Sequence, residues 1–458
     1  MSKVKAKPGT APATNGAVPP KSEAPKVSPI KAIQAKFQTA RKAMCNALVE
    51  RDSEVDLVLT ALIAHEHCLL IGAPGTGKSL LLDTVMRWVR GNEFNILLTK
   101  FTEPAEVLGP TSVAGLKEDK FRRVTTGMLP EAEFAFLDEV FRSSSAILNS
   151  LLKLLNERTF QNGTEGVINC PLRLCVAASN DWPNEDNGGA ELGALFDRFL
   201  FRKEVKSVSP TSGRRSLFNR AVKNQSCKAE FGETITAIEL DTASTAAKEL
   251  PWSNESILAL REITNALDAE GITFGDRRFV KAVNAVRAYA FLHGAEQVEP
   301  KHLEVLQHVL WNDPVEHPVK AAKIILRLSN PAAVALEEIQ AQAESVIDGK
   351  IPPAEAVVKL QELLATAATN AGVKEAHGLA HSTEYMKLEE MAKKVAKEPK
   401  AAKLVGFLVR SLRYAYSKSI GETVSKPFRS YGMPPKELPV KGISGTYGDE
   451  EIDLEEDL

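Results

Sequence analysis

Residues 67–79 read HCLLIGAPGTGKS, in which an apolar run passes into a glycine-rich loop. The run HCLLIG (67–72) predicts a buried strand, and the apolar residues that follow predict a helix over 79–89. The segment GAPGTGKS (72–79) fits the pattern G-x-x-x-x-G-K-S and lies between strand and helix, where that pattern operates. A chance glycine-rich turn would rarely meet both conditions. The stretch therefore predicts an α/β fold built around a phosphate-binding loop.

The chemistry of this loop predicts ATP and Mg²⁺ as its ligands. Its glycines let the backbone wrap around a β-phosphate, so that successive N–H groups and the helix N-terminus face the anion. Lys78 would supply a positive charge to the β- and γ-phosphates, and Ser79 a hydroxyl ligand to Mg²⁺. The expected nucleotide contacts are Gly72, Ala73, Pro74, Gly75, Thr76, Gly77, Lys78, Ser79 and Leu80.

A second motif predicts that the bound ATP is cleaved. In EFAFLDE (133–139) an apolar strand ends in two carboxylates. Asp138 would bind Mg²⁺ through water, and Glu139 would polarise the attacking water. Two solvated acids at a strand end are common in isolation. The apolar flank and the position downstream of the phosphate loop favour the hydrolytic interpretation.

Further patterns predict a parallel sheet flanked by helices. Strands are expected at 94–101, 173–180 and 201–207, since short apolar runs recur there between amphipathic stretches. A helix is expected over 145–158. Its apolar face would be formed by Ile147, Leu148, Leu151, Leu154 and Leu155.

Composition and patterning divide the chain into six segments. We expect a disordered basic Pro/Ala-rich tail (1–29), an α/β nucleotide-binding domain (30–206), a linker (207–250), an all-α lid (251–320), a further helical C-terminal region (321–420) and an extended acidic tail (421–458). The linker is expected to combine a short helix over 214–222 with a polar connector. Within the lid, Phe279, Val283, Val286 and Ala290 are expected to form the buried stripe of one helix.

The bulk composition of the 458 residues is that of an ordinary globular protein. The net charge of −2 gives no whole-molecule attraction to nucleic acid or anionic membrane. The five cysteines form no CxxC pair. The N-terminus has no apolar core like that of a signal peptide, and no uninterrupted apolar stretch reaches the length of a membrane span. These features predict a cytoplasmic protein without membrane insertion.

Several motifs together carry a resemblance to a known family. In chain order they are GAPGTGKS, FAFLDEVF, ILNSLLKLLNERTF, VAASN, LFDRF and GDRRF. As a set they resemble the MoxR branch of the AAA+ ATPases, especially its RavA-like members, over roughly residues 35–315. The resemblance implies an AAA+ P-loop domain with an all-α lid, ATP hydrolysis and a homo-hexameric ring. The C-terminal third matches only loosely.

The resemblance also implies roles for polar residues outside the phosphate loop. Asn180 in VAASN matches sensor 1, which helps align the hydrolytic water. Arg198 in LFDRF matches the arginine finger that reaches a neighbouring subunit's nucleotide, with Arg202 as a rival. Sensor 2 would be Arg277 or Arg278 in GDRRF, and Arg278 is preferred because Phe279 is expected to face the core. In some relatives this residue acts across the subunit boundary.

Two insertions are typical of this branch. Residues 101–130 fall where relatives insert an element into helix 2, and residues 158–176 predict a hairpin around an Asn162–Gly163 turn. The resemblance implies that both face the ring's central channel. The alternative is a pair of surface loops.

Three functions remain open. The first is a chaperone-like motor that remodels or assembles client proteins, with a von Willebrand factor A domain protein as partner. The second is a nucleic-acid motor or loader, for which the insertion offers Lys117, Lys120, Arg122 and Arg123, interrupted by Glu118 and Asp119. The third is a nucleotide-gated binding module with little turnover, which the intact acidic pair argues against.

Overall fold

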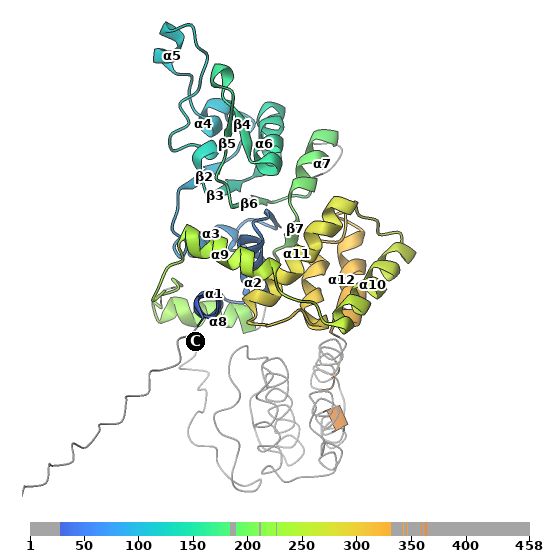
Figure 1. Cartoon of the computed structure of the whole chain (residues 1–458). Coiled ribbons are helices and arrows are strands. Elements are labelled where there is room, and N and C mark those ends of the chain that lie inside the picture. The colour runs from blue at the N-terminus through green and yellow to red at the C-terminus, as the bar shows by residue number, and fades with distance from the viewer. Residues whose placement is uncertain are drawn as a thin grey trace, which may run out of the picture.

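The computed structural model describes residues 28–330 apart from 184–188, 210–211 and 226, with a few isolated residues beyond 330. At its centre is a five-stranded parallel sheet of order β2-β3-β6-β1-β7 (Figure 1). The strands are β1 (Cys68–Ile71), β2 (Glu93–Leu97), β3 (Phe134–Asp138), β6 (Leu174–Ser179) and β7 (Phe201–Glu204). Strands β1 and β6 are buried along their whole length, which explains why they are apolar apart from Ser179 at the end of β6. The predicted α/β fold is confirmed.

Helices cover this sheet. They are α1 (Pro29–Ala47), α2 (Asp52–Ala64), α3 (Lys78–Met86), α6 (Ser145–Glu157) and α7 (Gly189–Arg198), with short 3₁₀ turns at η1 (Leu129–Glu131) and η2 (Val140–Arg142). All five residues expected on the apolar face of α6 are buried. On α1, Phe37 packs edge-on against Trp88 at 5.0 Å and against Phe291 at 6.4 Å between ring centroids. Helix α1 therefore joins the sheet domain to the lid.

The interval 207–250 contains the expected short helix and a second helix that was not expected. It contains α8 (Ser212–Val222) and α9 (Ala237–Lys248), and α9 begins with a capping box formed by Thr236 and Glu239. Helix α9 buries Leu240, Ala243 and Ala247 against α2 and α11. The expectation of a polar connector was wrong here, because alanines carry the buried face and give little hydrophobic signal.

The lid is all-helical, as predicted. It comprises α10 (Asn254–Ala269), α11 (Asp276–Leu292), the 3₁₀ segment η5 (Pro300–His308) and α12 (His317–Ser329). Figure 1 shows it in yellow and orange beside the sheet domain. The predicted stripe on α11 was wrong in part. Val286 and Ala290 are buried, whereas Val283 is half-buried and the half-buried Phe279 stacks on Phe274 instead. The inward side includes Arg278, which no hydrophobic pattern would place there.

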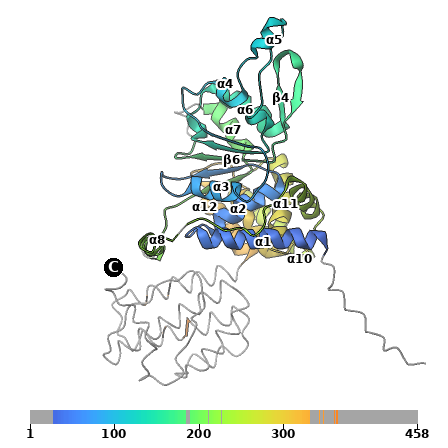
Figure 2. The same ribbon diagram turned by 90° about the vertical axis from the view of Figure 1, so that its left-hand side faces the viewer.

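The two insertions form one projection, here called the arm. Its elements are α4 (Pro104–Leu108), α5 (Val113–Lys117), β4 (Thr159–Gln161), the turn η3 (Gly163–Glu165) and β5 (Val167–Asn169). The hairpin is confirmed, with a longer loop than a two-residue turn. The Arg123 N–H donates to Asn162 Oδ1 at 2.7 Å, and the Thr164 N–H to Phe121 O at 2.8 Å. Figures 1 and 2 both show α5 beside the hairpin at the end distant from α1.

Three predicted segments lie wholly or largely outside the described residues. They are the tail (1–29) up to residue 27, the helical C-terminal region (321–420) beyond residue 330 apart from isolated residues, and the whole acidic tail (421–458). Within the described part of the chain, no helix combines the length and apolar character needed to cross a bilayer.

Candidate nucleotide-binding and hydrolysis site

The phosphate loop connects β1 to α3. Gly77 is the N-cap of α3 and has φ 86°, a left-handed conformation that glycine adopts without strain. Gly72 donates its N–H to Ser179 O at 3.1 Å, and a Cβ at Gly72 would overlap Val205 O. The loop is therefore fixed between the ends of β6 and β7, as a backbone cradle for an anion requires.

Lys78 is buried at the first position of α3. Its Nζ donates to Gly72 O, to Ala73 O at 3.2 Å and to Asn180 Oδ1 at 3.3 Å. Burial lowers the pKa of Lys78, and the charges of Asp138 and Glu139 oppose that shift. All three hydrogen-bond acceptors are neutral, so none of them neutralises the ammonium charge. Lys78 therefore holds a positive charge beside the loop that can bind a phosphate.

The acidic pair meets the phosphate loop because β3, β6 and β1 are neighbours in the sheet. Since parallel strands end at one edge, Asp138, Asn180 and the loop converge at that edge, as in other open α/β sheets. The Asn180 Nδ2 donates to Glu139 Oε1 and its Oδ1 accepts from Lys78. Asn180 thus links the acidic pair to the phosphate loop, and the three predicted features lie together.

Glu139 has a backbone and side-chain environment unusual for a carboxylate. Its φ is 54°, a left-handed conformation that costs a non-glycine residue roughly 1–2 kcal/mol. Its N–H donates to Asp138 Oδ1 at 3.0 Å. Its Oε2 is buried without a hydrogen bond, although Arg142 Nε lies 3.4 Å away. An acceptor of this kind can take a proton from a water held in the site.

The donor set also fits Mg²⁺. Ser79 is exposed on the first turn of α3, and the half-buried Asp138 carboxylate ends β3. Mg²⁺ in nucleotide sites is held by one or two such protein oxygens together with phosphate oxygens and water. The described residues contain no group of three or more His, Cys, Asp or Glu side chains that could hold a metal. These residues can therefore form a Mg²⁺ site in which Ser79 and Asp138 supply some of the ligands and a bound triphosphate supplies others.

The two arginines considered for the finger have different surroundings. Arg202 is buried, and its guanidinium donates to Phe199 O at 3.0 Å, Phe196 O at 3.1 Å and Trp311 O at 2.8 Å. It therefore joins β7 to the lid and cannot reach another subunit. Arg198 ends α7 with its side chain 27% exposed. Of the two arginines, Arg198 is the one whose side chain can reach another subunit.

The two sensor-2 candidates differ in the same way. Arg278 is buried, and it donates to Leu200 O and Val309 O at 3.1 Å and to Asp197 Oδ1 at 3.0 Å. Its donors hold the lid on the sheet domain. Arg277 is exposed. The preference for Arg278 assumed that Phe279 faces the core, and the structure does not support that assumption.

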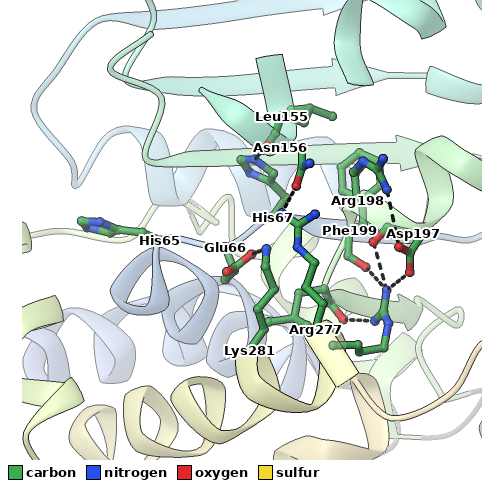
Figure 3. A network of polar contacts seen from close by, with 12 residues as sticks. His65, Glu66, His67, Leu155, Asn156, Asp197, Arg198, Phe199, Arg277 and Lys281 are labelled. Atoms are coloured by element: carbon green, nitrogen blue, oxygen red, sulfur yellow. Dashed lines mark hydrogen bonds and ion pairs between the residues drawn. The ribbon is translucent and has the colours of Figure 1, made fainter. Parts of the chain in front are cut away.

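Arg277 instead faces a pocket of about 230 Å³ at the junction of sheet domain and lid. Its Nη2 donates to Asn156 Oδ1 at the end of α6, and Lys281 pairs with Glu66 at 2.6 Å (Figure 3). The pocket is lined by Asn156, Asp197, Arg198, Leu200, Gly275, Arg277, Arg278, Lys281 and Asn312. Its cations outnumber its acids, which suits an anionic ligand.

Sequence reasoning missed two residues that contact this machinery. Asn156 is half-buried and bonds Arg277, and Arg51 is buried and bonds the phosphate loop. Asn156 is a polar residue on an amphipathic helix, and such a position gives no signal of a functional role in the sequence. Arg51 follows Glu50 in a charged stretch that gave no signal of burial.

A phosphate loop, an acidic pair and a polar residue on adjacent parallel strands, together with a helical lid, define a P-loop ATPase of the AAA+ class. Residues 35–244 match the family model described as "MoxR domain in the MoxR-vWA-beta-propeller ternary systems". Residues 255–325 match the model described as "AAA lid domain". The chain therefore belongs to the MoxR family of AAA+ ATPases.

The chain is also similar to individual proteins and to a solved structure. The chain is 37% identical over 309 residues to an uncharacterized protein, MJ0812, of Methanocaldococcus jannaschii, covering 66% of this chain and 78% of that one. It is 26% identical over 310 residues to Chaperone MoxR1 of Mycobacterium tuberculosis, covering 64% and 80% respectively. A solved structure of a candidate ATPase from Cytophaga hutchinsonii shares the fold, with a TM-score of 0.53 at 16% identity, over 65% of this chain and 96% of that one.

Proposed function

We propose that this chain is a ring-forming ATPase that remodels or assembles client proteins, and that it belongs to the RavA-like branch. In this proposal Lys78 and the loop amides bind ATP, while Ser79 and Asp138 hold Mg²⁺. Glu139 activates water, and Asn180 orients the side chain of Glu139. The hydrogen bond between Asn180 and Glu139 and the unbonded Oε2 of Glu139 support these roles.

The proposal of a ring is supported by the pocket that Arg198, Arg277 and Lys281 help to line. None of the pocket's lining residues belongs to the phosphate loop or to the acidic pair. Lys281 pairs with Glu66 and Arg198 lies 3.5 Å from Asp197, whereas Arg277 donates to the neutral Asn156. The charge of Arg277 in particular can therefore meet an anion other than the chain's own nucleotide. A head-to-tail ring would bring the neighbour's triphosphate to this surface. We assign Arg198 as the finger and Arg277, rather than Arg278, as sensor 2, both acting on the neighbouring subunit.

Mixing two inactive variants tests this geometry. An Arg198→Ala subunit keeps its own Glu139 but supplies no arginine finger to its neighbour. A Glu139→Gln subunit supplies the finger but lacks its own general base. In a ring, an Arg198→Ala subunit regains activity wherever the neighbour that serves it is Glu139→Gln. At equal amounts, about a quarter of the sites should hydrolyse ATP, since each of the two positions is filled correctly half the time. Phosphate release is measured across mixing ratios.

Lys78→Ala mixed with Glu139→Gln is the control. Both changes lie on the same side of the subunit interface, so this mixture should stay inactive at every ratio. Light scattering in ATP shows whether the mixed subunits assemble. If Arg198→Ala and Glu139→Gln form rings together but regain no activity, the finger does not act between subunits.

The arm is the proposed contact for client proteins, since the resemblance places its elements at the ring's channel. It carries several exposed apolar side chains: Phe101 at 92%, Val113 at 69%, Leu116 at 53% and Val167 at 63%. A protein with a von Willebrand factor A domain is the proposed partner. That proposal is supported by the words "MoxR-vWA-beta-propeller ternary systems" in the description of the matching family.

Trapping tests the remodelling role. Glu139→Gln in ATP should retain clients, because the cycle stops before the nucleotide is hydrolysed. Proteins captured with ATP are compared with those captured with ADP, and with those captured by Lys78→Ala in ATP. Capture of a von Willebrand factor A domain protein with Glu139→Gln in ATP alone is the expected result. The same proteins in all three samples would contradict the proposal.

The nucleic-acid alternative finds less support in the arm. Arg122 pairs with Glu165 at 2.7 Å, Lys120 with Glu118 at 3.3 Å, and Arg123 donates to Gly109 O at 2.8 Å. Three of the four basic residues of the insertion are thus engaged within the arm. Single-stranded DNA binding that falls steeply with salt would revive this alternative.

A further inference from the structure

Arg51 is an arginine whose donors meet only backbone carbonyls. It lies at the N-cap of α2 with 7% of its surface exposed. Its Nε and Nη2 donate to Thr76 O at 3.1 Å and 2.8 Å. Its Nη2 also donates to Lys206 O at 2.8 Å, and its Nη1 to Glu50 O at 2.8 Å. One guanidinium therefore holds the phosphate loop, the segment after β7 and the start of α2 together.

We propose that Arg51 is a positioning residue for the phosphate loop, which fixes the Thr76–Gly77 peptide in the orientation that binds a β-phosphate. A trans peptide is planar, and its C=O and N–H point in opposite directions. Because Arg51 holds Thr76 O with two donors, the Gly77 N–H must point to the opposite side. That amide opens α3, where the loop presents its N–H groups to an anion.

The space around Gly77 supports this role. A Cβ at Gly77 would lie 4.0 Å from Arg51 Nε, so the guanidinium lies directly beside this peptide. Gly77 has φ 86° and could adopt other conformations at little cost. Glycine gives the loop the freedom to wrap around a phosphate, and Arg51 removes that freedom at one peptide. A preorganised loop binds its ligand more tightly because less order is lost on binding.

The inference rests on the proposed nucleotide site and adds a residue that does not touch the nucleotide. Removing Arg51 should allow the Thr76–Gly77 peptide to rotate. The affinity for ligands that carry a β-phosphate should then fall. We expect Arg51→Met to reduce the affinity for ADP and ATP by about tenfold, the loss that corresponds to one interaction of ordinary strength. The affinity for AMP, which has no β-phosphate, should fall much less.

Arg202→Met is the matched control. Arg202 is also a buried arginine that donates to three backbone carbonyls, none of them in the phosphate loop. Both variants should lower the melting temperature, since each leaves buried carbonyls without a donor. Only Arg51→Met should weaken ADP binding. This comparison separates positioning of the loop from general stability.

The experiment measures the Kd of ADP by titration calorimetry and that of AMP by competition, for the parent and both variants. Arg51→Lys keeps the charge but has fewer donors, so it should fall between the parent and Arg51→Met, and it replaces Arg51→Met if that variant does not fold. ADP binding that is unchanged in Arg51→Met, or reduced equally in Arg202→Met, would overturn the inference. Equal losses of ADP and AMP would also overturn it. If the parent itself binds no ADP, the proposed function fails instead.

Discussion

Glu139→Gln is expected to slow ATP hydrolysis by about 10²–10⁴-fold, the usual contribution of a general base, while ATP still binds. The amide keeps the size of the side chain and can still pair with Asn180 after rotation. It cannot accept a proton from water, so the chemical step is lost and the binding step is kept. Single-turnover hydrolysis and the Kd of ATP are measured on the same preparation.

Glu204→Gln is the control for this prediction. Glu204 also ends a strand of the same parallel sheet, but β7 lies at the sheet's edge and the Glu204 side chain is 55% exposed. Its removal should leave turnover near the parent value. Turnover of Glu139→Gln at the parent rate would show that another group accepts the proton.

Lys78→Ala is expected to weaken ATP and ADP binding by roughly ten- to a hundredfold, because charge-assisted hydrogen bonds to the phosphates are lost. The fold should survive, since the partners of Lys78 within the chain are two loop carbonyls and the Asn180 amide. Nucleotide affinity is measured by titration calorimetry, and folding by circular dichroism.

Lys153→Ala provides the comparison for the loss of a lysine. Lys153 is exposed on α6 and should not affect nucleotide affinity. If Lys78→Ala bound ATP as tightly as Lys153→Ala, the loop would not hold phosphates in the way described here.

The central parts of the fold could be predicted because their signals are local. The strand before Gly72, the strand before Asp138 and the apolar face of α6 each follow from periodicity and length in a single segment. The phosphate loop was recognisable because its glycines, Lys78 and Ser79 stand at fixed spacing. The convergence of Lys78, Asn180 and Glu139 then follows from three neighbouring parallel strands.

The features that could not be predicted depend on contacts between distant segments. Helix α9 buries alanines, so its pattern resembled a polar connector. Arg278 and Arg202 are buried where backbone carbonyls of the sheet domain and the lid accept hydrogen bonds from their guanidinium groups, which no single segment reveals. The same holds for Arg51, whose acceptors Thr76 O and Lys206 O lie 25 and 155 residues away. The preference for Arg278 over Arg277 as sensor 2 rested on the prediction that Phe279 faces the core. In α11 Arg278 is itself buried, whereas Phe279 is only half-buried.

Calorimetric titration of the purified protein with ATP in the presence of Mg²⁺ tests directly whether the phosphate loop binds a triphosphate. We expect saturable binding of one ATP per chain, which weakens when Mg²⁺ is removed and is followed by release of phosphate. A folded protein that shows no saturable binding of any adenine nucleotide with Mg²⁺ would contradict it.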